Sequence, residues 1–448
     1  MQAVDTIISA RWIVPVEPEG VVLDHHALVI DGGRILDILP VAAATARYRA
    51  AAVHALEDHV LMPGLINAHT HAAMCLLRGL ADDLPLNSWL NDHIWPAEGR
   101  HVSEEFVHDG TLLAAAELIR GGVTCINDMY FFPDVTARVC NEVGLRACIG
   151  LIVLDFPSAW AGDANEYIAR GTALYDAHRD DALLSFAFAP HAPYTVSDAP
   201  LERVRTLAGE MLDLPVHMHV HETAHEVEES LARYGVRPLE RLDRLGLLNG
   251  SLAAVHMTQI TDDEIARLAE AGASVLHCPE SNLKLASGFC PVDRLVRAGV
   301  NVAIGTDGAA SNNDLDMFGE MRIASLLAKG VSGDATALPA PTALRMATLN
   351  GARALGLAGE TGSLVAGKAA DVIAVRLDSP ETLPIYNVIS QLVYACGRHL
   401  VTDVWIAGRH LLKQRELTTI DRRAVKTLAT QWCARIAGTG HNNPITLP

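Results

Sequence analysis

The sequence predicts an α/β protein built on a (β/α)8 TIM barrel, and three observations support that fold. Apolar runs alternate with helix-patterned stretches through the middle of the chain, which is typical of parallel strands joined by crossover helices. Eight such runs can be counted between residues 65 and 307. Several of them end in histidine or aspartate, as expected for a barrel whose active-site groups lie at the carboxyl ends of the strands.

The eight apolar runs are the expected barrel strands. In chain order they cover residues 65–71, 123–129, 146–155, 183–191, 215–222, 252–257, 273–279 and 300–307. Helix-like segments fall between them, including residues 103–120, 200–212, 262–271 and 291–298. We therefore expect the barrel to occupy residues 62–364.

The two ends of the chain differ from the middle. Short strand-like runs punctuated by Gly, Pro and Asp precede residue 62 and recur after residue 364. We expect residues 1–61 and 365–448 to combine into one small β-sandwich domain beside the barrel. Residues 421–438 are predicted to form a helix, and the tail beyond them is predicted to be loose.

The composition and net charge of the chain disfavour some classes of binding partner. Half of the 448 residues are hydrophobic, and the formal net charge of −18 disfavours nucleic acid or an anionic membrane as a partner. No stretch of about 18 uncharged apolar residues predicts a membrane span. Eight scattered cysteines and a start without a secretory signal predict reduced thiols and a cytoplasmic protein. Homo-oligomerisation is left open.

The first apolar run ends in His69 and His71, just after a Pro-Gly break. Side chains two residues apart on a strand share a face, so both imidazoles can bind one metal ion. His219 on the fifth run and Asp307 at the end of the eighth complete the set. Three imidazoles and a carboxylate suit a catalytic zinc ion that keeps one position for water. We expect a metal-dependent hydrolase with one Zn²⁺, or another divalent ion, per chain.

Two alternatives concern the fifth run. His217, His219 and His221 share one strand parity, so spacing does not select the ligand among them. We favour His219, and expect the other two to pack inside the barrel or to support the ligands. Residues 221–225 also match the His-Glu-x-x-His pattern of zinc proteases, which requires one helix. The pattern follows a strand-like run here, so we disfavour that interpretation.

Other polar and aromatic residues are candidates for catalysis or binding. Glu222 is the natural general acid or base, although it could instead stabilise a helix N-terminus. His256 ends the sixth run and is either catalytic or a packed core histidine. On sequence alone, Glu98 is typical of a surface carboxylate, and Trp89 and Trp95 are typical of core or interface aromatics.

These motifs together resemble the amidohydrolase superfamily, and closely its 5′-methylthioadenosine/S-adenosylhomocysteine deaminase branch. The resemblance runs from about residue 61 to 367 and rests on residues 63–71, 78–83, 89–98, 189–195, 219–223, 277–288 and 305–313. It implies a barrel of the amidohydrolase type. It also implies a hydrolytic deaminase that converts an adenosine thioether into the inosine analogue and ammonia.

The resemblance implies roles for individual residues. The metal ligands would be His69, His71, His219 and Asp307. Glu222 would protonate the purine ring nitrogen, His256 would orient the water, and Asp307 would accept a proton. The substrate contacts would include Glu98 on the ribose hydroxyls, His191, Trp95, Glu222 and Asp307.

One departure from the family pattern bears on the substrate. Some members of this branch carry a substrate-contacting arginine after the third strand, whereas residues 154–160 contain none. We therefore expect 5′-methylthioadenosine to be preferred over S-adenosylhomocysteine, whose charged tail would lack a partner.

Three other functions are known or conceivable for a barrel of this kind. Guanine-type deamination, or deamination or dechlorination of s-triazines, occurs in resembling sequences and is the main alternative. A ring-opening amidase would usually need a bridging lysine on the fourth strand, and residues 183–191 contain none. A non-catalytic scaffold would typically have lost metal ligands, and all four are present here.

Overall fold

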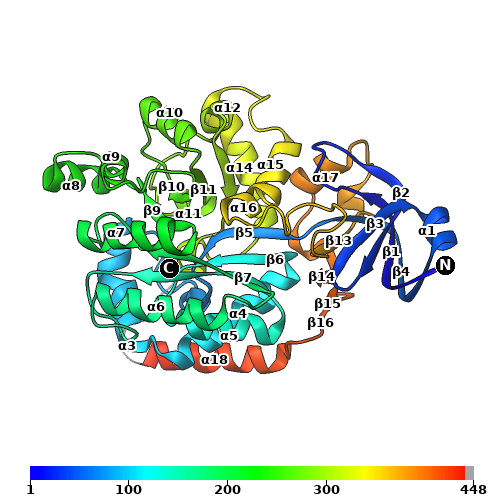
Figure 1. Cartoon of the computed structure of the whole chain (residues 1–448), viewed down its shortest axis with the longest axis horizontal. Coiled ribbons are helices and arrows are strands. Elements are labelled where there is room, and N and C mark those ends of the chain that lie inside the picture. The colour runs from blue at the N-terminus through cyan, green and yellow to red at the C-terminus, as the bar shows by residue number, and fades with distance from the viewer. Residues whose placement is uncertain (439–448) are drawn as a thin grey trace, which may run out of the picture.

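Eight parallel strands form the predicted barrel, and their hydrogen-bonded order follows the chain (Figure 1). The computed structural model describes residues 1–438. The barrel strands are β5 (Leu65–Thr70), β6 (Val123–Asp128), β7 (Arg146–Val153), β8 (Leu184–Pro190), β9 (Val216–Val220), β10 (Leu252–His256), β11 (Ser274–His277) and β12 (Asn301–Ile304). Each lies within one of the eight predicted runs, so periodicity and strand-end residues located the barrel correctly.

Helices follow the strands and surround the barrel (Figure 1). They are α4 (Glu104–Arg120), α5 (Pro133–Val143), α6 (Ala164–His178), α7 (Asp198–Arg205), α8 (Ala224–Tyr234), α9 (Pro238–Arg244), α10 (Asp262–Ala271), α11 (Pro279–Lys284), α12 (Val292–Arg297), α13 (Ala309–Asn312), α14 (Met317–Ser332), α15 (Ala340–Met346) and α16 (Leu349–Ala354). The helix predicted at 200–212 is α7 continued by the π-helical segment η3 (Thr206–Leu212). Helix α10 begins at a capping box of Thr261 and Glu264, which satisfies otherwise unpaired N–H groups.

The last barrel strand meets the first at the predicted metal ligands. The backbone N–H of Asp307 donates to the carbonyl oxygen of His69 over 3.0 Å. A Cβ on Gly305 would lie 2.6 Å from the His69 backbone nitrogen, so only glycine allows this approach. The first and eighth strand ends are therefore held together by the backbone itself.

Both chain ends contribute to a second, mixed sheet, as predicted. Its strands are β1 (Gln2–Ile13), β2 (Leu23–Asp31), β3 (Arg34–Pro40), β4 (Tyr48–Pro63), β13 (Val372–Arg376), β14 (Val401–Ile406), β15 (Arg409–Lys413) and β16 (Glu416–Leu417). Hydrogen bonds join them in the continuous order β16-β15-β14-β13-β4-β1-β2-β3, with β1 and β4 parallel. Short helices accompany them: α1 (Val41–Arg47), η4 (Pro380–Thr382), α17 (Val388–Tyr394) and η5 (Arg398–Leu400).

The chain passes from the mixed sheet into the barrel through Gly64, between β4 and β5. A Cβ there would lie 2.0 Å from the Thr124 side chain, so the predicted Pro-Gly break has a packing cause. Nearby, the buried Arg146 Nε lies 2.7 Å from Asp371, which ties β7 to the residue before β13. The domain limits of 1–61, 62–364 and 365–448 stay a prediction.

Helix α18 (Arg422–Gly438) matches the helix predicted at 421–438. It packs on the outside of α4, where the rings of Trp432 and Phe106 meet edge to face at 5.3 Å (Figure 1). The Trp432 indole N–H also donates to Asp109 over 2.8 Å. The final segment of the chain thus covers a barrel helix. Residues 439–448, predicted to be a loose tail, lie outside the described residues.

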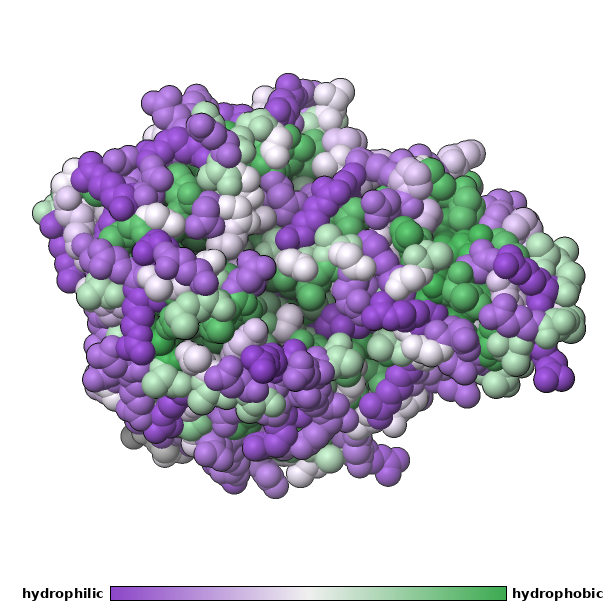
Figure 2. Space-filling model, in the orientation of Figure 1, coloured by the Kyte–Doolittle hydropathy of each residue, from purple (hydrophilic) through white to green (hydrophobic). Residues whose placement is uncertain are grey.

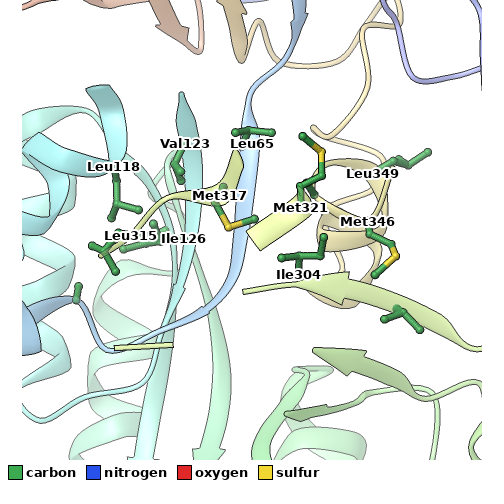
Figure 3. Packing of buried hydrophobic residues seen from close by; sticks show 14 of the residues in the cluster. Leu65, Leu118, Val123, Ile126, Ile304, Leu315, Met317, Met321, Met346 and Leu349 are labelled. Carbon is green, nitrogen blue, oxygen red and sulfur yellow. The ribbon is translucent and has the colours of Figure 1, made fainter. Parts of the chain in front are cut away.

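The main hydrophobic core lies between the barrel strands and their helices. Figure 3 shows part of it, with Leu65, Val123 and Ile304 on strands near side chains from α4, α14, α15 and α16. On the surface, hydrophobic residues interrupt the hydrophilic covering in patches (Figure 2). Within residues 1–438, no helix is long and apolar enough to span a membrane.

Candidate active site

The four predicted ligands meet at the carboxyl ends of β5, β9 and β12. One ligand-type atom from each of His69, His71, His219 and Asp307 lies within 4.8 Å of the others. The Nε2 atoms of His69 and His71 are 3.3 and 3.2 Å from Asp307 Oδ1. The Nε2 atoms of His69 and His219 are 3.2 Å apart. The cluster therefore points three ring nitrogens and one carboxylate oxygen at a common centre.

Each imidazole is held by its other ring nitrogen. Nδ1 of His71 contacts the carbonyl oxygen of Met129, and Nδ1 of His219 lies 2.8 Å from that of His191. A carbonyl oxygen only accepts, so both Nδ1 atoms carry a proton, and Nε2 is the ring atom that faces the cluster. Burial lowers the pKa of His71, but the neighbouring Asp307 outweighs burial and raises that pKa to about 9, so a metal ion would bind His71 by displacing its Nε2 proton. Burial lowers the pKa of His69 to about 4, so its ring is neutral near pH 7. This donor set fits a divalent metal ion.

Asp307 is held by hydroxyl and amide donors. Its Oδ2 accepts from Ser281 Oγ at 2.6 Å and from Ser311 Oγ at 2.8 Å. Its Oδ1 accepts from the Gly308 N–H at 2.8 Å. Burial raises the pKa of this carboxyl, but contacts with His69 and His71 outweigh burial and leave it well below the usual value. The carboxylate is therefore ionised and fixed in orientation.

Two residues of the site have left-handed backbones. Asp307 has φ of +60° and His256 has φ of +73°, and neither is glycine. Such conformations are costly and persist where the surroundings impose them, which is common at functional sites. In both cases the residue leaves its strand end with its side chain lining the pocket.

Glu222 and His256 lie beside the ligand cluster. His256 Nε2 is 3.8 Å from Glu222 Oε2, and its Nδ1 lies 2.8 Å from Asn282 Oδ1. Because the Asn282 oxygen accepts, Nδ1 of His256 carries the proton and Nε2 faces the pocket. Burial raises the pKa of Glu222, which favours a carboxyl able to hold and release a proton.

The pocket that contains these groups spans about 840 Å³ when its opening to solvent is included. It is lined at one end by His71, His219 and Asp307 of the ligand cluster, by Glu222 and His256, and by the partly buried His191, whose pKa desolvation lowers to about 3. The remainder of the lining is mostly apolar, from the segment after β5 and from the ends of β6 and β7: Met74, Leu86, Trp89, Leu90, Ile94, Trp95, Met129, Phe131, Ile152, Leu154 and Phe156. No lysine or arginine of residues 1–438 lines it.

Glu98 is a pocket residue rather than a free surface carboxylate. It lies on α3 (Trp95–His101), which follows η1 (Ala72–Leu77), α2 (Leu86–Ser88) and the π-helical η2 (Trp89–Ile94). Tyr130 Oη donates to Glu98 Oε1 over 2.6 Å. Burial raises the pKa of Glu98 to about 7, although the Tyr130 hydrogen bond opposes that shift. Trp95 lies near the rim, 37% exposed, with its ring 6.5 Å from that of Phe156.

The other two histidines of the fifth predicted run are not among the four clustered residues. His217 is fully buried, and its Nε2 lies 2.8 Å from Nδ1 of His69. His221 Nε2 accepts the backbone N–H of Leu239 over 3.0 Å, which joins the end of β9 to α9. The His-Glu-x-x-His pentad does not lie on one helix, because α8 begins only at Ala224. The protease interpretation is thus excluded on geometry.

Sequence reasoning did not identify several residues of the site. Tyr130, Ser281, Ser311 and Asn282 all contact its functional groups. Ser281 and Asn282 lie within the stretch 277–288, and Ser311 within 305–313, so their neighbourhood was noted without a role. Tyr130 follows the second predicted strand by one residue, and that position is its only signal.

The comparisons with known proteins point to one family. Residues 60–411 match the amidohydrolase family. A protein of Saccharophagus degradans named 5-methylthioadenosine/S-adenosylhomocysteine deaminase is 51% identical over 432 residues, covering 96% of this chain and 97% of its own. A relative of the same name from Teredinibacter turnerae is 49% identical, covering 96% and 97%.

Solved structures agree with this fold. An adenosine deaminase from Xanthomonas campestris, crystallised with bound zinc, is 58% identical with a TM-score of 0.96, covering 98% of this chain and 99% of its own. An atrazine chlorohydrolase from Arthrobacter aurescens shares the fold at 20% identity and a TM-score of 0.89, covering 96% and 100%.

Proposed function

Because the chain belongs to the amidohydrolase family, we propose that it is a hydrolytic deaminase of adenosine thioethers, with 5′-methylthioadenosine preferred. The reaction replaces the amino group of the purine by oxygen and releases the inosine analogue and ammonia. The observation that carries this proposal is one pocket lined both by three of the four clustered ligands and by Glu98. The names of the relatives at 51% and 49% identity support the deaminase over the triazine or guanine alternatives.

His69, His71, His219 and Asp307 would hold one divalent ion, and the bound zinc of the Xanthomonas campestris protein favours Zn²⁺. When bound, such an ion lowers the pKa of water to about 7 and so supplies a nucleophile at neutral pH. Glu222 donates a proton to the ring nitrogen beside the reacting carbon. His256, fixed by Asn282, aligns the attacking water. Asp307 accepts that water's proton and passes it toward the leaving amine.

The substrate would extend from the ligand cluster toward the outer pocket. His191 contacts the nucleoside, Glu98 accepts hydrogen bonds from the ribose hydroxyls, and Trp95 covers the rim. The apolar lining around Leu154 and Phe156 suits a methylthio group. A zwitterionic tail would be desolvated there without a cationic partner. We also infer a cytoplasmic setting, which the eight unpaired cysteines support.

The test is a substrate panel read by ammonia release. We expect 5′-methylthioadenosine to give the highest kcat/KM, above S-adenosylhomocysteine, adenine, guanine and an aminotriazine. Efficient deamination of a free base would overturn the nucleoside assignment. Equal or better use of S-adenosylhomocysteine would overturn only the preference for the small tail.

A further inference from the structure

We propose that Tyr130 is a positioning residue that makes the enzyme selective for substrates with a 2′,3′-diol, by fixing the carboxylate of Glu98. This inference rests on the proposed function, in which Glu98 receives the ribose hydroxyls. The geometry that carries it is the 2.6 Å hydrogen bond from Tyr130 Oη to Glu98 Oε1 inside the substrate pocket.

The bond joins two separately placed segments. Tyr130 lies two residues beyond the end of β6, so the barrel sets its position. Glu98 lies on α3, which belongs to the segment between β5 and α4. Helix α3 has seven residues, and a side chain on so short an element gains most of its precision from tertiary contacts. The hydrogen bond from Tyr130 therefore restricts the position of the Glu98 carboxylate relative to the barrel, although Glu98 itself is not on a barrel strand.

Tyr130 is itself well fixed. Its side chain is 4% exposed and packs in a hydrophobic cluster with Met74, Trp89 and Ile94. Its ring lies 5.3 Å from the Phe131 ring and 6.4 Å from that of the ligand His71. One residue thus contacts both the ligand cluster and the proposed ribose acceptor. It therefore ties the position of the Glu98 carboxylate to that of the ligand cluster.

The hydrogen-bond inventory matches a diol. When ionised, above its pKa of about 7, Glu98 offers about four lone-pair sites, and Tyr130 occupies one on Oε1. Each ribose hydroxyl brings one O–H donor, so the carboxylate can accept both. The Tyr130 hydroxyl donates its proton to Glu98. The Tyr130 oxygen can therefore act toward the substrate only as an acceptor, on the same side of the pocket. A substrate without the hydroxyls would leave Glu98 buried and short of donors, which is unfavourable.

The experiment compares 5′-methylthioadenosine with its 2′,3′-dideoxy analogue in the metal-loaded enzyme. Tyr130→Phe removes the hydroxyl but keeps the ring that packs against the cluster. We expect kcat/KM for the diol substrate to fall about 10–100-fold, the scale of a hydrogen bond to a charged group, chiefly through KM. For the dideoxy analogue we expect a change of less than about threefold. Glu98→Asp, which shortens the side chain that carries the carboxylate, should likewise lower kcat/KM for the diol substrate and leave kcat/KM for the dideoxy analogue nearly unchanged.

Two further measurements separate positioning from general damage. In the Glu98→Leu background, which has no acceptor for the Tyr130 hydroxyl, Tyr130→Phe should cause no additional loss, because both variants remove the same hydrogen bond. Tyr194→Phe is the matched control, since Tyr194 lines the same pocket and its hydroxyl is not bonded to Glu98. That variant should affect both substrates by one common factor.

The outcomes distinguish the two proposals. Equal losses for both substrates in Tyr130→Phe, or additive losses in the double variant, would overturn the role of Tyr130. A wild-type enzyme that used the dideoxy analogue as well as the diol would instead overturn the role of Glu98 and, with it, the selectivity attributed to Tyr130. Metal content and thermal unfolding of each variant report whether the site and the fold are retained.

Discussion

The two ends of the substrate pocket are built differently. At the inner end, the proposed ligands and proton carriers lie at or just beyond the ends of barrel strands, and hydrogen bonds such as Ser281 to Asp307 hold them in place. At the outer end, apolar side chains such as Leu90, Leu154 and Phe156 come from connecting segments and make mainly packing contacts. The barrel therefore defines the reaction, while the segments above it select the substrate. Substitutions at the inner end should change turnover, and those at the outer end should change preference.

The largest effect should come from removing a ligand at the inner end. Asp307→Ala deletes the oxygen that faces two imidazoles, so activity and bound metal should both be lost. The fold should persist, because the closure between Asp307 and His69 uses backbone groups. Elemental analysis, ammonia release and circular dichroism measure the three properties. An Asp307→Ala protein that kept its metal and its activity would contradict the assignment.

Glu222→Gln tests whether the inner end separates metal binding from proton transfer. The amide retains shape but cannot carry the proton, so kcat should fall by about 10²–10⁴, the usual scale for a positioned acid or base. Metal content should remain at the wild-type level, since Glu222 is not among the four clustered ligands. Loss of the metal in this variant would make Glu222 a ligand, and near-normal turnover would deny its role.

His217 tests the support behind the ligands. Its Nε2 lies 2.8 Å from Nδ1 of His69 and fixes that ring with its Nε2 toward the cluster. His217→Phe should weaken metal affinity by about 10–100-fold, the usual cost of losing a group that orients a ligand. A chelator competition titration measures the affinity. His217→Gln, whose amide oxygen can accept a hydrogen bond, should recover part of it. Unchanged affinity in both variants would reduce His217 to a packing residue.

The smallest effect should come from the outer end, and it should alter preference rather than turnover. Phe156 is 42% exposed at the rim, so an arginine there can reach solvent and still face a substrate tail. Phe156→Arg should raise kcat/KM for S-adenosylhomocysteine relative to 5′-methylthioadenosine by up to about fivefold, as for an exposed ion pair of up to about 1 kcal/mol. Phe156→Leu is the uncharged control. If Phe156→Arg changed only kcat, the proposed division between an inner end that sets turnover and an outer end that sets substrate preference would be wrong.

The same contrast explains what the sequence could predict. The strands were found because apolar periodicity and strand-end residues are local signals, and His69, His71 and Asp307 follow from their places at strand ends. Residues that act through tertiary hydrogen bonds carry no such signal. Tyr130 meets Glu98 from another segment, and Ser281 meets Asp307 from another strand end. Likewise, the packing of α18 on α4 includes a ring contact between Phe106 and Trp432, which lie far apart along the chain.

The pairing of β4 with β13 has a consequence for the making of the protein. Pro63 of β4 pairs with Val372 of β13, so the neighbour on that side of β4 is translated long after β4 itself. At about 5–20 residues per second, the ribosome needs roughly 15–60 s to supply it. During that time β1 to β4 can pair with one another. The other edge of β4, which includes the apolar Leu61 and Met62, has no partner strand until β13 is made. A nascent chain stalled before residue 372 should therefore be more prone to chaperone binding and aggregation than one released just after β14.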